Sequence, residues 1–189
     1  MKAVIQIWVV LGIIFLAGAA SAEEETKQRS TAYPPVALAD ILDSVSKKTG
    51  RVFLTGPRVP ADVVVGQLKA KDISYASMLI VLYNNDLAAF TVGEITNIVH
   101  AARVRQHSLP FVNEDDDSIA DYEWVHRIVE VRNGHAPQYV PLLRPLLPQM
   151  AHLVADKGSN SLIIVGRYSN TKRLIAIIEA MDKHSTRQD

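Results

Sequence analysis

The six histidines carry the most versatile side-chain chemistry of this chain, because an imidazole can hold a metal ion or transfer a proton near neutral pH. They are His100, His107, His126, His135, His152 and His184. No two are four residues apart, the spacing that places two metal ligands on one face of a helix. The chain has no cysteine, which excludes thiol catalysis, cysteine zinc sites and iron–sulfur clusters. We therefore predict no metal ion and no cofactor, and we interpret His126 as a half-exposed strand residue.

The serines, glycines and carboxylates also lack the spacings that catalysis requires. The strained Gly-x-Ser-x-Gly turn that exposes a serine nucleophile is absent, as is a glycine-rich phosphate loop. Gly158 to Ser161 (GSNS) is typical of a turn. The acidic run from Glu114 to Asp117 lacks the alternating carboxylates and distant glutamate of a calcium loop, so we interpret it as part of a solvated linker. We predict no catalytic residues and no enzyme activity.

The first 22 residues have the three parts of a secretory signal peptide. Met1-Lys2 precedes an uncharged run that closes with the small residues Ala20-Ser21-Ala22. We predict cleavage between Ala22 and Glu23, and the alternative is an uncleaved anchor, since twenty uncharged residues just span a bilayer. An exported chain without cysteine suits the periplasm. Cleavage would remove Lys2 and leave 19 Lys and Arg against 20 Asp and Glu, a charge of about −1 that offers nucleic acid no basic field.

A first small domain is predicted at residues 33–107, after a flexible polar leader at residues 23–32. Leu38, Ile41, Leu42 and Val45 recur at the spacing of one helix face, and Gly50 can close that helix in the left-handed conformation. Strands are expected at residues 51–54 and 63–68. A second helix capped by Ser74 is expected to bury its stripe of Ala76, Leu79, Ile80 and Tyr83. Gly93-Glu94 then joins a hairpin of strands at residues 88–92 and 95–100.

A second small domain is predicted at residues 124–184, between an acidic linker at residues 108–123 and a tail at residues 185–189. A strand at residues 124–131 precedes a helix with a stripe of Tyr139, Leu142, Leu143 and Leu146, which starts near Pro137 and which Pro141 and Pro145 shorten or kink. Two strands, at residues 153–155 and 162–165, and a last helix capped by Ser169 or Asn170 complete the order βαββα. The fold class is thus α+β, with two small mixed domains, the second KH-like in its order. KH-type RNA modules need a Gly-x-x-Gly loop, which is absent.

Small mixed sheets leave strand edges whose free N–H and C=O groups can pair with a partner chain. The candidates are Val63, Val64 and Val65, and the segment that contains Val36. Pro34 and Pro35 cannot donate to a ladder, so this segment is an edge or no strand. The valines could equally form a buried inner strand. Arg144 and Asn160 complete the predicted protein-interface residues. Each domain has a modest core, which favours packing against neighbours.

Three stretches of the sequence resemble the N-terminal periplasmic domains of type II secretion secretins. The stretch in the first domain is KKTGRVFLTGPRVPADVVVG (Lys47 to Gly66). In the second the more specific parts are VPLLRPLLPQ (Val140 to Gln149) and SNSLIIVG (Ser159 to Gly166). The resemblance covers nearly all of the chain after the predicted signal peptide, and it accounts for Pro141 and Pro145, because related helices carry prolines at such places.

The resemblance implies a function in protein secretion. In secretins these domains form stacked periplasmic rings; the first receives the inner-membrane clamp protein and the second packs side to side. Since the resemblance covers no membrane barrel, we expect a non-enzymatic component that joins a separate secretin barrel, binds the clamp protein and forms a homo-oligomeric ring, with no nucleic acid or small-molecule substrate. The alternatives are a free-standing periplasmic binding module or regulator that competes for secretin partners, and a decayed secretin fragment. Type IV pilus and type III secretion secretins share these modules.

Overall fold

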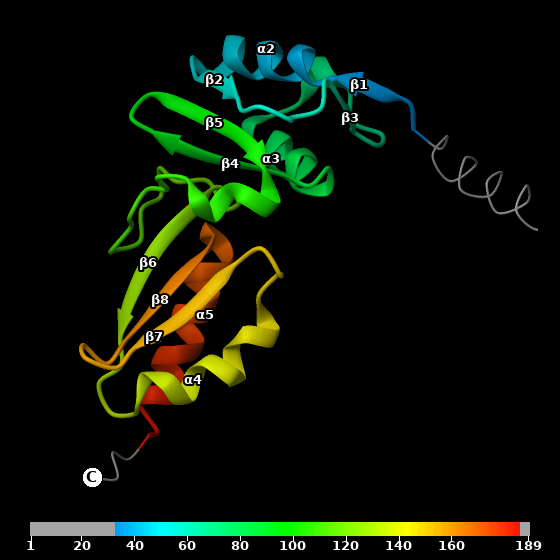
Figure 1. Ribbon diagram of the computed structural model, residues 1–189. Coiled ribbons are helices and arrows are strands. Elements are labelled where there is room, and N and C mark those ends of the chain that lie inside the picture. Colours follow the sequence, from blue (N-terminus) through cyan, green and yellow to red (C-terminus); the bar gives the residue numbers. More distant parts are fainter. Residues whose placement is uncertain (1–32, 186–189) are drawn as a thin grey trace, which may run out of the picture.

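The computed structural model describes residues 33–185 as two small α/β parts joined by an ordered connection (Figure 1). The predicted signal peptide with its cleavage site at Ala22 and Glu23, the leader (residues 23–32) and residues 186–189 of the predicted tail lie outside the described residues. Each part combines helices with small sheets, and the pairing is mainly antiparallel, which confirms the α+β class.

The first part contains two sheets and two α-helices. Its elements are β1 (Pro35–Ala37), α2 (Leu38–Thr49), β2 (Val52–Thr55), β3 (Asp62–Val64), η1 (Ala70–Asp72), α3 (Tyr75–Asn84), β4 (Leu87–Val92), β5 (Ile95–His100) and η2 (Ala101–Gln106). Strands β1 and β3 pair antiparallel, and the other three form a sheet of order β2-β5-β4 with β2 parallel to β5. The Gly93-Glu94 hairpin is confirmed, with Gly93 at φ 60°.

The ends of the two helices follow the sequence signals. Gly50 closes α2 at φ 72°, and its N–H donates to the Ser46 carbonyl over 2.8 Å. Leu38, Ile41 and Val45 are buried along the predicted stripe of that helix. The Ser74 hydroxyl accepts the Ser77 N–H at the start of α3, as expected of an N-cap.

The buried face of α3 differs from the predicted stripe. Met78, Leu79, Val81 and Leu82 are buried, whereas Ala76, Ile80 and Tyr83 are exposed. The helix is apolar nearly all round (YASMLIVLYN), so periodicity alone could not select the face that packs on α2 and β4. Strand β3 is also shorter than the predicted 63–68, because Gly66 turns the chain at φ 65°.

The second part has the predicted βαββα order, with one sheet backed by two α-helices. Its elements are β6 (Trp124–Glu130), α4 (Ala136–Leu143), η3 (Arg144–Leu146), β7 (His152–Asp156), β8 (Ser161–Arg167) and α5 (Tyr168–Asp182), with sheet order β6-β8-β7 and antiparallel pairing throughout. Pro137 lies in the first turn of α4, and Pro141 lies inside this short helix. Tyr139 and Leu143 are buried, but Leu142 and Leu146 are exposed, contrary to the predicted stripe.

The connection between the two parts caps the last helix. We expected Ser169 or Asn170 to cap α5, and this is wrong: the helix begins at Tyr168 without a side-chain cap. The N–H groups of Tyr168 and Ser169 instead donate to the carbonyls of Glu123 and Asp121, over 2.8 and 2.9 Å. Backbone from a distant segment therefore satisfies donors that a local side chain usually satisfies.

A continuous core joins the two parts. Ala88, Phe90 and Val99, on the face of the β2-β5-β4 sheet turned away from α2 and α3, pack in one cluster with Trp124 and Leu153 of the second part. Leu109, Val112 and Glu123 of the predicted solvated linker are buried, while Glu114 to Asp117 are exposed. The domain boundaries drawn from the sequence stay predictions, but the connection between them is not wholly solvated.

Candidate interaction surfaces

The predicted edge at Val36 and Val63 to Val65 forms the small β1–β3 sheet. Val36 pairs with Val63, and Pro35 pairs with Val64. The Val63 and Val65 side chains are buried in the first core, whereas Val64 is 47% exposed. Only Val64 of the three valines therefore offers its side chain to a partner.

The other edge of β3 is closed by an asparagine that the sequence argument missed. The Asn85 side chain accepts the Val64 N–H over 2.8 Å and donates to the Val64 carbonyl over 2.9 Å. It also donates to the Val81 carbonyl at the end of α3. Asn85 thus occupies the position of a neighbouring strand, which leaves the β1 side as the accessible edge of this sheet.

Asn160 and Arg144 make internal hydrogen bonds rather than standing free. Asn160 has φ 49°; its amide donates to the carbonyls of Val131 and Gly134 and accepts the Ala136 N–H at the start of α4. The Arg144 guanidinium donates to the carbonyls of Pro148 and Gln149. Both residues shape surfaces on which a partner could dock, but their polar atoms are already engaged within the chain.

An apolar row lies on the open end of the first sheet. Val52, Ile95 and Val92 stand in register across β2, β5 and β4, on the same face because paired residues share a face of a sheet. They are 37–51% exposed, and Leu54, two residues along β2, is 52% exposed. The same face is covered by the second part at Phe90 and Val99. The row is hence the uncovered end of a surface that is otherwise core.

A second open region lies along β6 in the second part. The backbone of Pro110 to Val112 pairs with β6 at His126, so its first half is covered. Beyond that point, a cavity of about 440 Å³ is lined by Ile128 and Val129 of the strand and by Ile175 and Glu179 of α5. Ile128 is 45% exposed. An edge strand beside a cavity is a place where another chain can add.

The junction between the parts contains a buried carboxylate. Glu123 is 2% exposed, and it accepts hydrogen bonds from the hydroxyls of Tyr75 (2.9 Å) and Thr91 (2.6 Å). Burial, followed by the Glu123 charge, raises the pKa of Tyr75 to about 12, so this hydroxyl stays a donor across the physiological range. The polar contact fixes the end of the connection to the first sheet.

An arginine between two tyrosines also spans the junction. The Arg167 guanidinium lies 3.9 Å from the ring centroid of Tyr83 on α3 and 5.0 Å from that of Tyr122 in the connection. Arg167 is the last residue of β8. Elements from both parts therefore meet around one cation.

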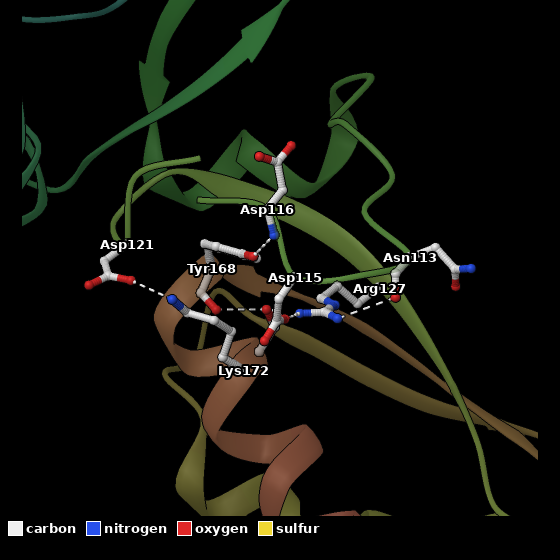
Figure 2. A network of polar contacts seen from close by, with 8 residues as sticks. Asn113, Asp115, Asp116, Asp121, Arg127, Tyr168 and Lys172 are labelled. Carbon is white, nitrogen blue, oxygen red and sulfur yellow. Dashed lines mark hydrogen bonds and ion pairs between the residues drawn. The ribbon is translucent and has the colours of Figure 1, made fainter. Parts of the chain in front are cut away.

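The acidic connection is anchored to the second part by the network shown in Figure 2. Arg127 of β6 is 4% exposed and binds the Asp115 carboxylate at 2.6 Å and the Asn113 carbonyl at 3.3 Å. The Asp116 N–H donates to the Tyr168 hydroxyl, and Lys172 pairs with Asp121 at 3.1 Å. The carboxylates of Asp115 and Asp121 and the backbone of Asp116 thus hold the segment in place.

A second buried carboxylate, Asp182, holds the turn after β6. Its oxygens accept the N–H groups of Arg132, Asn133 and Gly134 and the Tyr139 hydroxyl. Burial by itself would raise the pKa of this carboxyl, but the three backbone donors outweigh it, and the pKa lies below its ordinary value. The end of α5 is thereby fastened to the start of α4.

The possible metal ligands of the described residues are scattered rather than grouped. Between residues 33 and 185 no group of three or more His, Cys, Asp and Glu side chains is placed to hold a metal ion. His126 is half-buried, and burial lowers the pKa of its imidazole. None of the helices in that range combines the length and apolar character needed to cross a bilayer.

Comparison with known proteins shows similarity to secretins. No protein-family model matches the chain. Secretin XcpQ of Pseudomonas aeruginosa is 28% identical over 149 residues, which are 77% of this chain and 22% of XcpQ. Secretin ExeD of Aeromonas hydrophila is 28% identical over 182 residues, 92% of this chain and 26% of ExeD. The chain thus spans about a quarter of the length of these relatives.

A solved structure shows the same fold. A chain in the type II secretion outer-membrane complex of Klebsiella pneumoniae, which contains PulD, PulS and the HR domain of PulC, aligns with 80% of this chain. The alignment covers 26% of that chain, with 24% identity and a TM-score of 0.62. An alignment of this extent reaches into both parts described above.

Proposed function

We propose that this chain, a homologue of the N-terminal domain region of type II secretion secretins, supplies periplasmic ring domains to a secretion pore. The observation that carries the proposal is the similarity to XcpQ and ExeD, which runs through 77–92% of the chain and so includes both folded parts. The shared fold with the PulD complex supports it.

The surfaces of the molecule support a scaffold rather than a catalyst. The row of Val52, Val92, Ile95 and Leu54 exposes apolar side chains on a regular sheet, and such a patch is stabilised when a partner covers it. The open edges of β1 and β6 provide backbone groups for a further strand.

We further propose two binding partners for this chain. The first is an inner-membrane clamp protein, since the related Klebsiella complex includes the HR domain of PulC. We assign it to the first part, at the β1 edge with Val36 and Val64. The second is a separate secretin barrel protein, which the second part would join through a homo-oligomeric ring. The predicted export places these contacts in the periplasm.

Cross-linking in intact cells tests the proposal. The full chain carries an affinity tag, is cross-linked in the envelope, and its partners are identified after purification. We expect an outer-membrane secretin barrel in comparable amount, together with an inner-membrane clamp protein. A matched pair of variants locates the contact surface. The double variant Val52→Asp and Leu54→Asp should reduce recovery of the secretin barrel. The variant Leu68→Asp, at a residue that is 47% exposed and lies outside the row, should not reduce it.

One outcome would contradict the proposed function, and another would contradict only the contact surface assigned to it. Recovery of the clamp protein alone, or of the uncross-linked monomer, would exclude a secretin ring and favour a free-standing module. Equal recovery of the barrel with both variants and with the unchanged chain would exclude the apolar row as a contact surface, while leaving the ring function in place.

A further inference from the structure

A pocket with a basic rim lies between the turn after β2 and helix η2. The cavity is about 350 Å³, and its lining includes Gly56, Pro57, Val99 and Ala102. Four exposed basic side chains line it: Arg58, His100, Arg103 and His107. Within residues 33–185 none of the four lies within ion-pair distance of a carboxylate, since the ion pairs there are Lys47–Asp43, Arg127–Asp115 and Lys172–Asp121. The pocket therefore offers apolar surface beside two arginines, Arg58 and Arg103, that make no ion pair among residues 33–185, while the His100 Nδ1 accepts the Ala102 N–H.

The backbone around this pocket is held in an uncommon conformation. Arg58 has φ 72°, a value that non-glycine residues rarely adopt. The preceding Gly56 donates its N–H to the Ile98 carbonyl over 2.8 Å, and a Cβ at Gly56 would lie 3.3 Å from the Val99 side chain. The turn is thus packed tightly onto β5, which holds the Arg58 backbone beside the pocket.

The same chain displays a segment with complementary chemistry. Glu114, Asp115, Asp116 and Asp117 are exposed, and the nearby Phe111 is 58% exposed. The segment is pre-organised, because the Val112 N–H donates to the His126 carbonyl over 2.9 Å and Arg127 binds Asp115. In the described residues, Glu114 and Asp117 make no ion pair. The segment thus presents the exposed Phe111 side chain together with two carboxylates, Glu114 and Asp117, that have no ion-pair partner among the described residues.

We propose that the basic pocket receives the Phe111–Asp117 segment of a second copy of this chain. The pocket lining contains no residue of that segment, so a copy does not fill its own pocket. The exposed Arg58 and Arg103 of the pocket are cationic and the exposed Glu114 and Asp117 of the segment are anionic, so the two surfaces are complementary in charge. Contact between two unlike patches is head-to-tail, the arrangement that closes into rings. The inference deepens the proposed function and rests on it.

Engineered disulfides test the contact directly, because the chain has no cysteine of its own. Full-length Ala102→Cys and Asn113→Cys chains carry different tags and are expressed together, then oxidised in the envelope. We expect a cross-linked pair that contains both tags. Matched controls replace Ala102→Cys with Leu68→Cys, an exposed site outside the pocket, and should give no such pair.

Charge reversal tests the chemistry of the same contact. One variant carries Arg58→Glu and Arg103→Glu in the pocket, and another carries Glu114→Lys and Asp117→Lys in the segment. Either variant alone should lower the yield of the cross-linked pair by about tenfold or more, because like charges then meet at the contact. Both changes in one chain should restore it, since each patch regains an opposite partner. Raising the salt concentration should weaken the unmodified contact.

The outcomes separate this inference from the proposed function. Absence of the mixed pair, or charge reversal without effect, would overturn the contact even when the secretin barrel co-purifies with the chain. A cross-linked pair that charge reversal abolishes would support the contact even if no barrel is recovered, and the ring function would then fail separately.

Discussion

Single buried polar residues hold the two parts together, and Glu123 is the clearest case. Its carboxylate receives two hydroxyl donors at the junction and is 2% exposed. Replacement by alanine removes the acceptor and leaves the Tyr75 and Thr91 hydroxyls without their partner. A buried donor without an acceptor costs more than the hydrogen bond itself contributes.

Glu123→Ala should therefore lower the free energy of unfolding by about 2–3 kcal/mol. Denaturant titration followed by circular dichroism measures this value. Glu114→Ala is the matched control, because Glu114 is exposed in the same connection, and its effect should stay within about 0.5 kcal/mol. Equal effects of the two changes would show that the Glu123 contacts contribute nothing.

Asp182 gives a prediction that depends on pH. Its folded pKa lies below the ordinary value, so its charged form stabilises the fold above the unfolded pKa of about 4, and this contribution is lost as pH falls through the folded pKa. Asp182→Ala should cost about 2–3 kcal/mol at pH 7, and the difference from the unchanged protein should narrow below about pH 4. Denaturant titration from pH 3 to pH 7 measures it, with the exposed Glu179→Ala as control. A difference that is constant over this range would contradict the assignment.

At the scale of elements, short strands depend on side chains for their edges. The β1–β3 sheet is only three residues long, and Asn85 supplies the hydrogen bonds that a third strand would make. The same amide ends α3 by donating to the Val81 carbonyl. Helix end and strand edge are thus stabilised by one residue.

Asn85→Ala should expose the edge of β3. We expect hydrogen exchange of the Val64 amide to accelerate by about tenfold or more, since removal of about 1.4 kcal/mol of protection is a factor of ten. Asn84→Ala, one residue earlier and exposed, should leave that amide unchanged. Unchanged Val64 exchange in Asn85→Ala would mean that another group protects the edge.

At the scale of the whole molecule, the two parts are coupled through a shared core and through Arg167. The guanidinium contacts rings from α3 and from the connection, so its removal should loosen the junction without damaging either core. Arg167→Ala should cost about 1–2 kcal/mol and increase proteolysis within residues 108–123. Lys172→Ala, whose ion pair with Asp121 lies at the surface, should change stability by at most about 1 kcal/mol. Identical proteolysis in both variants would exclude Arg167 as the coupling residue.

Local sequence signals were sufficient to predict most of the helices and strands. Gly50 and Ser74 mark helix ends because their conformation or hydroxyl acts within a few residues, and Gly93-Glu94 forms its hairpin for the same reason. Alternation and helical spacing likewise predicted the βαββα order of the second part. The family resemblance was also present in short stretches of sequence, such as Ser159 to Gly166.

Tertiary structure decided the features that depend on distant partners. The sequence of α3 is apolar on all sides, so only its packing on α2 and β4 selected Met78 and Leu82 over Ile80. The start of α5 is capped by carbonyls of Asp121 and Glu123, more than forty residues before it in the chain, a contact that no local pattern encodes. The sequence by itself determined which segments form helices and strands, because those preferences are local. The buried faces, the covered edges and the burial of Glu123 required the folded chain, because each depends on which remote segment comes to lie beside it.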